Sequence, residues 1–187
     1  MNPWYTYSGE TIDFSNFTVD KVRLPDIARS LSHQCRFGGH VAEFYSVAQH
    51  SVLVAERLRR WNMNPITVRW GLMHDAAEAY ITDVPRPIKA IMQVGVESYR
   101  TIEARLLEVI ADAFGLPPWI PEPVWNADRD LLYAEALALQ PKAGELWVPE
   151  LAECGDLPTI QPWTPKEAYR AFFDLFNQLF ASREEAA

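Results

Sequence analysis

The chain has 187 residues, 49% of them hydrophobic and 22% charged, which suits one domain whose core needs no disulfide or structural metal. Its formal net charge of −8 at pH 7 argues against binding to the backbone of a nucleic-acid polymer, which requires a broad basic surface. With no apolar run of bilayer length and no charged-then-apolar leader, we expect a soluble, cytoplasmic protein that has no membrane partner.

The first 25 residues are expected to be irregular. Gly9 and Pro25 interrupt this segment, and its short alternating pieces are typical of a small hairpin. We expect aromatic side chains between Trp4 and Leu24 to shape a binding pocket. Asp26 then predicts a cap for a short helix over 26–32.

The remaining elements are predicted to be helical. Apolar residues recur at three- and four-residue steps, the period of a helix that packs one face on a core. Asn64 and Pro65 are a typical cap and first-turn pair. The predicted elements are a glycine turn over 37–39, helices over 42–61, 64–83, 97–114 and 122–139, a short helical turn over 89–94, a Pro-rich surface loop over 141–163, and a C-terminal helix over 164–182 with a capping box. The prediction is an all-α single domain over 1–187.

Residue types that bind metal ions occur in three of the predicted helices. His50 lies in the first, the adjacent pair His74-Asp75 in the second and Asp128 in the third, where Asp130 competes with it. Two imidazoles and two carboxylates form a donor set of intermediate softness, which suits Mn²⁺, Co²⁺, Zn²⁺ or Fe²⁺. Each such residue alone is more often a packing or surface residue. An adjacent His-Asp pair in an apolar helix, however, would otherwise bury charge at a cost of several kcal/mol.

Residues suited to proton transfer and phosphate binding lie near this set. Glu78 follows His74 by four residues and therefore lies on the same side of the helix, one turn along. Either Glu78 or Asp83 could take a proton from a water that a cation has acidified. The candidate substrate-binding residues are Arg36, Arg86 and Lys89, which could clamp phosphate oxygens, and Phe37, which could stack on a base.

The sequences around these residues resemble the H…HD…D signature of the HD-domain metal-dependent phosphohydrolases. His50 stands in Val-Ala-Gln-His-Ser-Val, the pair in His-Asp-Ala-Ala-Glu over 74–78, and Asp128 in Val-Trp-Asn-Ala-Asp. The run over 74–89 is similar to the small bacterial and bacteriophage branch that cleaves deoxynucleotides. Most of the chain, from about residue 24 to the last helix, can be laid over that pattern.

The resemblance implies an HD-type helical bundle with a divalent cation, which could be Mn²⁺, Co²⁺, Zn²⁺, Fe²⁺ or Mg²⁺. The implied metal ligands are His50, His74, Asp75 and Asp128. Glu78 and Asp83 would orient or activate the attacking water, and Arg36 and Lys89 match basic positions for phosphate.

The implied activity is hydrolysis of the 5′ phosphoester of a small-molecule deoxynucleotide. A monophosphate would release phosphate, and a triphosphate would release triphosphate, by attack at the same phosphorus. The resemblance also implies a homo-oligomer in the cytoplasm of a bacterium, or of a bacterial host if the protein is phage-encoded. Two alternatives stay open, a cyclic or signalling-nucleotide phosphodiesterase and a non-catalytic nucleotide-binding module.

Overall fold

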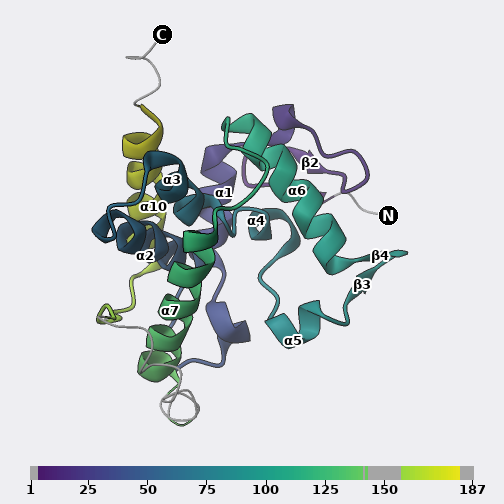
Figure 1. The fold of residues 1–187 in the computed structure, drawn as a ribbon. Coiled ribbons are helices and arrows are strands. Elements are labelled where there is room, and N and C mark those ends of the chain that lie inside the picture. Colours follow the sequence, from purple (N-terminus) through teal and green to yellow (C-terminus); the bar gives the residue numbers. More distant parts are fainter. Residues whose placement is uncertain (1–3, 141, 143–156, 182–187) are drawn as a thin grey trace.

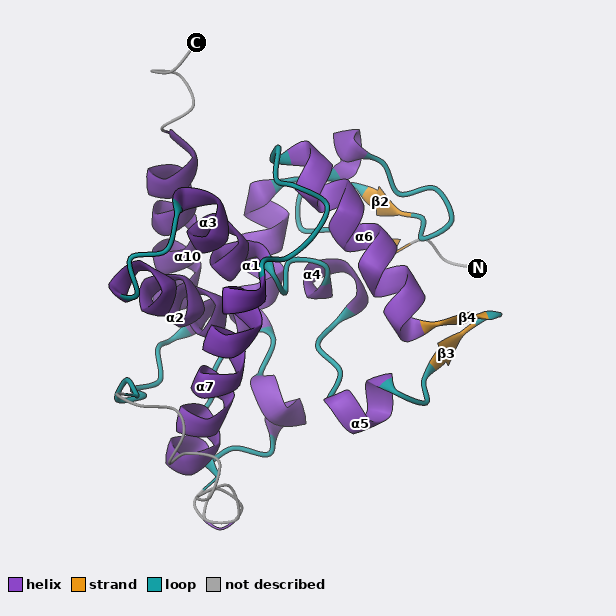
Figure 2. Cartoon of the chain, viewed as in Figure 1, coloured by secondary structure: helices purple, strands orange, loops and turns teal. Residues whose placement is uncertain are grey.

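The chain folds into helices that pack around one central helix (Figure 1). The computed structural model describes residues 4–140, 142 and 157–181. Within these ranges the all-α prediction is confirmed, since helices dominate and the strands form two short antiparallel hairpins (Figure 2). None of the helices in the described ranges combines the length and the apolar character needed to cross a bilayer.

The elements follow one another with these bounds: β1 (Trp4–Tyr5), β2 (Thr11–Ile12), η1 (Val19–Lys21), α1 (Leu24–His33), η2 (Arg36–Gly39), α2 (Val47–Arg60), α3 (Pro65–Met73), α4 (Glu78–Ile81), α5 (Arg86–Lys89), β3 (Gln93–Val94), β4 (Glu97–Ser98), α6 (Tyr99–Ala113), α7 (Glu122–Leu139) and α10 (Pro165–Phe180). The expected N-terminal hairpin is β1–β2. The helix predicted over 122–139 has the bounds of α7.

Helix α2 is the centre of the packing. It contacts α1, α3, α7 and α10, and α10 also packs on α1 and α3. The apolar faces of these helices form one continuous core, in which Tyr45, Trp70 and Phe172 are among the largest fully buried side chains. In Figure 1, α6 lies apart from this group. Helix α5 and the β3–β4 hairpin lie below α6, and α7 lies to the left of α5 and α6.

Local caps set several helix starts as predicted. The side chain of Asn64 accepts a hydrogen bond from the backbone N–H of Thr67 at the start of α3. Thr164 and Glu167 form the predicted capping box at the start of α10. Each cap gives a partner to backbone N–H groups that have none within the helix.

The prediction of one continuous helix over 64–83 was wrong. Helix α3 ends at Met73, and α4 begins at Glu78. Between them the hydrogen bonds join residues three apart, as in the 3.0 Å bond from the Glu78 N–H to the Asp75 carbonyl. The His-Asp pair lies in this more tightly wound segment, at the junction of α3 and α4.

Three other boundaries differ from the predictions. The helix expected from residue 42 begins at Val47, because Ser46 provides the cap. Asp26 lies inside the first turn of α1 and accepts hydrogen bonds from Ser8 instead of capping the helix. The turn of helix expected over 89–94 is replaced by α5 and the β3–β4 hairpin, which turns at Gly95 with φ 66°. Most of the loop expected over 141–163, and the end of the helix expected to residue 182, lie outside the described residues.

The close approach of α3 to α2 depends on Gly71. A Cβ at this position would lie 2.5 Å from Leu58 Cδ1 and 3.1 Å from the Cα of Ala55. Leu58 could rotate away, but the backbone at Ala55 could move only by separating the two helices. We expect Gly71→Ala to lower the free energy of unfolding by about 1–3 kcal/mol through overpacking, despite the better helix propensity of alanine.

Urea denaturation would measure this effect. Ile66→Ala, at an exposed position on the same helix, is the matched control and should change stability little. A more stable Gly71→Ala protein would contradict the tight contact.

Candidate metal centre and cleft

The predicted metal-ligand residues converge from three parts of the chain. His50 comes from α2, His74 follows α3 and Asp128 comes from α7, and one ligand atom of each lies within 4.8 Å of the others. The Nε2 atoms of the two histidines are 3.3 Å apart, and Asp128 Oδ1 is 3.2 Å from His50 Nε2. All three residues are buried.

Asp75 completes the predicted set of four. Its Oδ2 lies 3.3 Å from His74 Nε2 and 3.7 Å from His50 Nε2, and its side chain is the most exposed of the four. Asp130, the competing residue, points elsewhere and pairs with Arg57 at 2.6 Å. The structure therefore places Asp128 in the cluster and gives Asp130 a separate partner.

Hydrogen bonds to the other ring nitrogen orient both imidazoles. His50 Nδ1 lies 2.7 Å from Glu135 Oε1, and His74 Nδ1 lies 2.9 Å from the Gly71 carbonyl oxygen. Since these oxygens only accept, each Nδ1 carries a proton, and Nε2 is the ring atom through which each imidazole would bind a cation at the shared centre. Such outer partners are typical of metal-binding histidines.

Glu135 belongs to the cluster, and the sequence analysis did not name it. Its carboxylate is fully buried and receives hydrogen bonds from Arg36 Nε at 3.0 Å, the Tyr45 hydroxyl at 2.8 Å and His50 Nδ1. It follows Asp128 by seven residues, two helical turns, so both carboxylates lie on the same side of α7. The seven-residue spacing could have indicated that Glu135 faces the same way as Asp128. The hydrogen-bond partners of Glu135, however, come from distant segments of the chain.

The charges of the cluster shift the pKa values of its members. Burial and Arg36 act to lower the pKa of His50, but Glu135 and Asp128 outweigh them and raise it to about 9. Burial acts to raise the pKa of Asp128, yet His50, His74 and Arg36 lower it overall. The pKa of Glu135 is also lowered, because Arg36 and His50 together outweigh its burial. The centre therefore keeps its carboxylates ionised.

Glu78 lies at the cleft wall beside a lysine. Its Oε1 accepts a hydrogen bond at 2.7 Å from Lys89 Nζ, which also donates to Glu103 at 2.6 Å. Its Oε2 is buried, with no hydrogen-bond partner among the described residues. Burial, followed by the charges of Asp75 and Asp83, raises the pKa of Glu78 well above its usual range. This carboxyl can hold a proton at a pH at which an exposed glutamate cannot.

Asp83 is held by a strained turn and by Gln34. The Gln34 side chain accepts from the Asp83 N–H at 2.7 Å and donates to the Glu78 carbonyl at 2.9 Å. Between them Thr82 has φ 72° and ψ 153°, a conformation that a β-branched residue rarely adopts, and its carbonyl accepts from the Tyr99 hydroxyl. Gln34 was not predicted to have a role. It holds the two candidate proton-transfer residues at one place in the cleft.

The four predicted substrate-binding residues all line one cleft with the centre. Arg36 is buried and paired with Glu135 and, at 3.6 Å, with Asp75. Arg86 is exposed, and its guanidinium donates to Asp128 Oδ2 at 2.6 Å. Phe37 lies next to Arg36 with φ 58°. The side chain of Arg36 is therefore engaged in holding the carboxylates, which the sequence analysis did not foresee.

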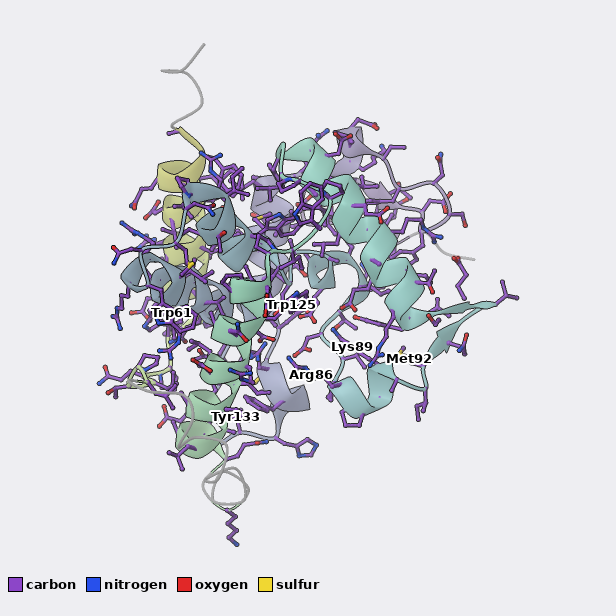
Figure 3. All side chains as sticks on the ribbon, viewed as in Figure 1. Trp61, Arg86, Lys89, Met92, Trp125 and Tyr133 are labelled. Carbon is purple, nitrogen blue, oxygen red and sulfur yellow. The ribbon has the colours of Figure 1, made fainter. Side chains whose placement is uncertain are left out.

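The cleft has a volume of about 1250 Å³ and lies between α7 on one side and α5 and α6 on the other. Figure 3 shows Trp125 on α7 and Arg86 and Lys89 near α5 around this space. Its described lining begins at Arg36, so the expectation that aromatics before Leu24 shape the pocket is not supported. These aromatics have other partners: Trp4 packs on Phe14, and Phe17 packs on Tyr80 of α4.

Comparisons with known proteins identify relatives but add no function. No family model matches the chain. It is 36% identical over 181 residues to the uncharacterized protein YfdR of Escherichia coli (strain K12), which covers 96% of each chain. An uncharacterized protein of Rhodobacter capsulatus is 35% identical over 125 residues, 64% of this chain and 62% of that one. The chain thus belongs to the same protein family as Escherichia coli YfdR.

Proposed function

We propose that this protein is a metal-dependent phosphohydrolase of the HD superfamily that cleaves the 5′ phosphoester of deoxynucleotides. The observation that carries the proposal is the convergence of His50, His74 and Asp128, with ligand atoms within 4.8 Å of one another, beside Asp75 in a cleft. These are the four residues of the H…HD…D pattern, and they come from α2, from the junction of α3 and α4, and from α7.

The donor set fits a divalent cation. Two imidazole nitrogens face each other at 3.3 Å, and carboxylate oxygens of Asp75 and Asp128 lie 3.2–3.7 Å from one of them. In the absence of a shared proton or a cation, such close lone pairs repel, so a cation among them would replace repulsion by attraction. Nitrogen and oxygen donors together suit Mn²⁺, Fe²⁺, Co²⁺ or Zn²⁺, and Mg²⁺ would use the carboxylates.

The remaining residues of the cleft have roles in this proposal. A bound cation would supply an acidified water and neutralise charge on phosphoryl oxygens. Glu78, with its raised pKa, would accept a proton from the attacking water and give one to the leaving 5′ oxygen, which becomes the hydroxyl of the nucleoside. Lys89 and Arg86 would bind phosphate oxygens, after exchanging their present carboxylate partners for the substrate.

The experiment is a panel of deoxynucleoside mono-, di- and triphosphates with Mn²⁺, Co²⁺, Zn²⁺, Fe²⁺ or Mg²⁺, with the products separated by chromatography. Release of nucleoside from monophosphates would support a 5′-deoxynucleotidase. Release of intact triphosphate would support a triphosphohydrolase. Turnover of cyclic nucleotides alone, or binding without turnover, would replace the proposal by a phosphodiesterase or a nucleotide-binding module.

Metal binding should release a proton from the centre. In the metal-free protein the pKa of His50 is about 9, so at neutral pH its Nε2 carries a proton that a cation must displace. We expect about one proton released per ion and an apparent affinity that rises about tenfold per pH unit as the pH approaches that value. Calorimetry in buffers of different ionisation enthalpy would measure this. An affinity independent of pH would show that His50 is already neutral.

A further inference from the structure

We propose that the outer part of the cleft is a nucleobase subsite, in which Trp125 is the stacking surface that selects base-bearing substrates. The inference rests on the proposed function, because it assumes that a phosphate binds at the metal centre. It differs from the sequence-based expectation, which assigned base stacking to Phe37 and to the N-terminal aromatics.

Trp125 combines exposure with a position in the cleft lining. The side chain is 49% exposed and lines the same cleft as Asp75 and Asp128, whereas Trp70, on the inner wall, is 1% exposed. A large aromatic ring that faces a cleft is typical of a ligand contact. Figure 3 shows it beside α7, with Arg86 and Lys89 in the direction of α5.

The distance between the proposed subsite and the metal centre follows from the positions of Trp125 and Asp128 on α7. Trp125 precedes Asp128 by three residues, so the two side chains lie on neighbouring parts of one helix face, a little less than one turn or about 4.5 Å apart along the axis. This separation is comparable to the span of the pentose between a 5′ phosphate and its base. A nucleotide with its phosphate at the metal centre, which Asp128 helps to form, would thus bring its base to Trp125.

The surroundings of Trp125 suit a flat ring with polar edges. Apolar side chains of Leu107 on α6 and Ile120 before α7 line the cleft with it, while Asn126 and Arg129, also in the lining, offer amide and guanidinium groups for a base edge. Among small phosphate esters, a nucleotide combines a flat ring that can cover the apolar side chains with polar edges that can bond the amide and the guanidinium. A sugar phosphate without a base would leave the apolar surface uncovered.

The experiment compares Trp125→Ala and Trp125→Phe with the matched control Trp119→Ala. Trp119 is 65% exposed, lies six residues away and is not in the cleft lining. For each variant, kcat/KM is measured for a deoxynucleoside monophosphate and for deoxyribose 5-phosphate, which lacks the base. Loss of base stacking should lower the ratio of the two values about 5- to 100-fold in Trp125→Ala, mainly through KM, and less in Trp125→Phe. Trp119→Ala should keep the wild-type ratio.

The outcomes separate this inference from the proposed function. If the wild type hydrolyses nucleotides and Trp125→Ala keeps the wild-type ratio, the subsite is wrong and the function stands. If the wild type hydrolyses no phosphoester, calorimetric binding of a deoxynucleoside monophosphate to the wild type and to Trp125→Ala decides the subsite alone. Equal affinities would then overturn it, and weaker binding by the variant would support it.

Discussion

His74→Ala is expected to lose divalent cation binding, and hydrolysis should fall by more than about 100-fold. Removing a residue that only supports a metal ligand commonly costs 10- to 100-fold in affinity or activity, so removing a ligand should cost at least that. His74 lies between His50 and Asp75, with its Nε2 within 3.3 Å of an atom of each. Calorimetric titration with Mn²⁺ and the rate of nucleoside release would measure the two losses.

Because His74 is buried, alanine leaves a small cavity, and the unfolding midpoint of the variant is therefore measured beside its cation binding. His33→Ala is the matched control: His33 is exposed at the end of α1, and within the described part of the chain its ring bonds its own helix, at Arg29 and Ser32. It should bind the cation as the wild type does. Wild-type binding by His74→Ala, with an unchanged unfolding midpoint, would exclude His74 as a ligand and would require a different centre.

Glu135→Ala is expected to have the second largest effect, on both stability and metal binding. The substitution leaves the buried Arg36 guanidinium with Asp75 at 3.6 Å as its remaining salt-bridge partner. Breaking such a buried pair typically costs about 3–5 kcal/mol. It also removes the acceptor for the Nδ1 proton of His50, which should weaken cation binding about 10- to 100-fold. Urea denaturation and a Mn²⁺ titration would measure the two effects.

Glu135→Gln separates the two effects. The amide keeps an oxygen acceptor and nearly the same volume, so more stability should remain than in Glu135→Ala. The negative charge that raises the pKa of His50 is lost, so the pKa should fall and less proton should be released when the cation binds. Wild-type affinity and proton release in Glu135→Gln would show that Glu135 supports the fold and does not tune His50.

Much of the fold could be predicted from the sequence, because the deciding interactions are local. Apolar side chains at helical spacing, the Asn64-Pro65 start of α3 and the capping box at Thr164 each depend on residues within a turn or two of one another. The bounds of α7 followed for the same reason. Local patterns failed at the junction of α3 and α4, where the hydrogen bonds tighten to residues three apart, and at the β3–β4 hairpin, which turns at Gly95 with a positive φ.

The sequence by itself determined which residue types could form a metal site, since His50, the pair at 74–75 and Asp128 stand in a recognisable spacing. Only the tertiary structure decided which atoms meet. Asp128 was separated from Asp130 by the direction in which each faces on α7, and Glu135 acquired its role from Arg36, Tyr45 and His50, segments 85 to 99 residues away in the sequence. Burial and charge pairing act between side chains that are close in space, and helix packing alone brings these together.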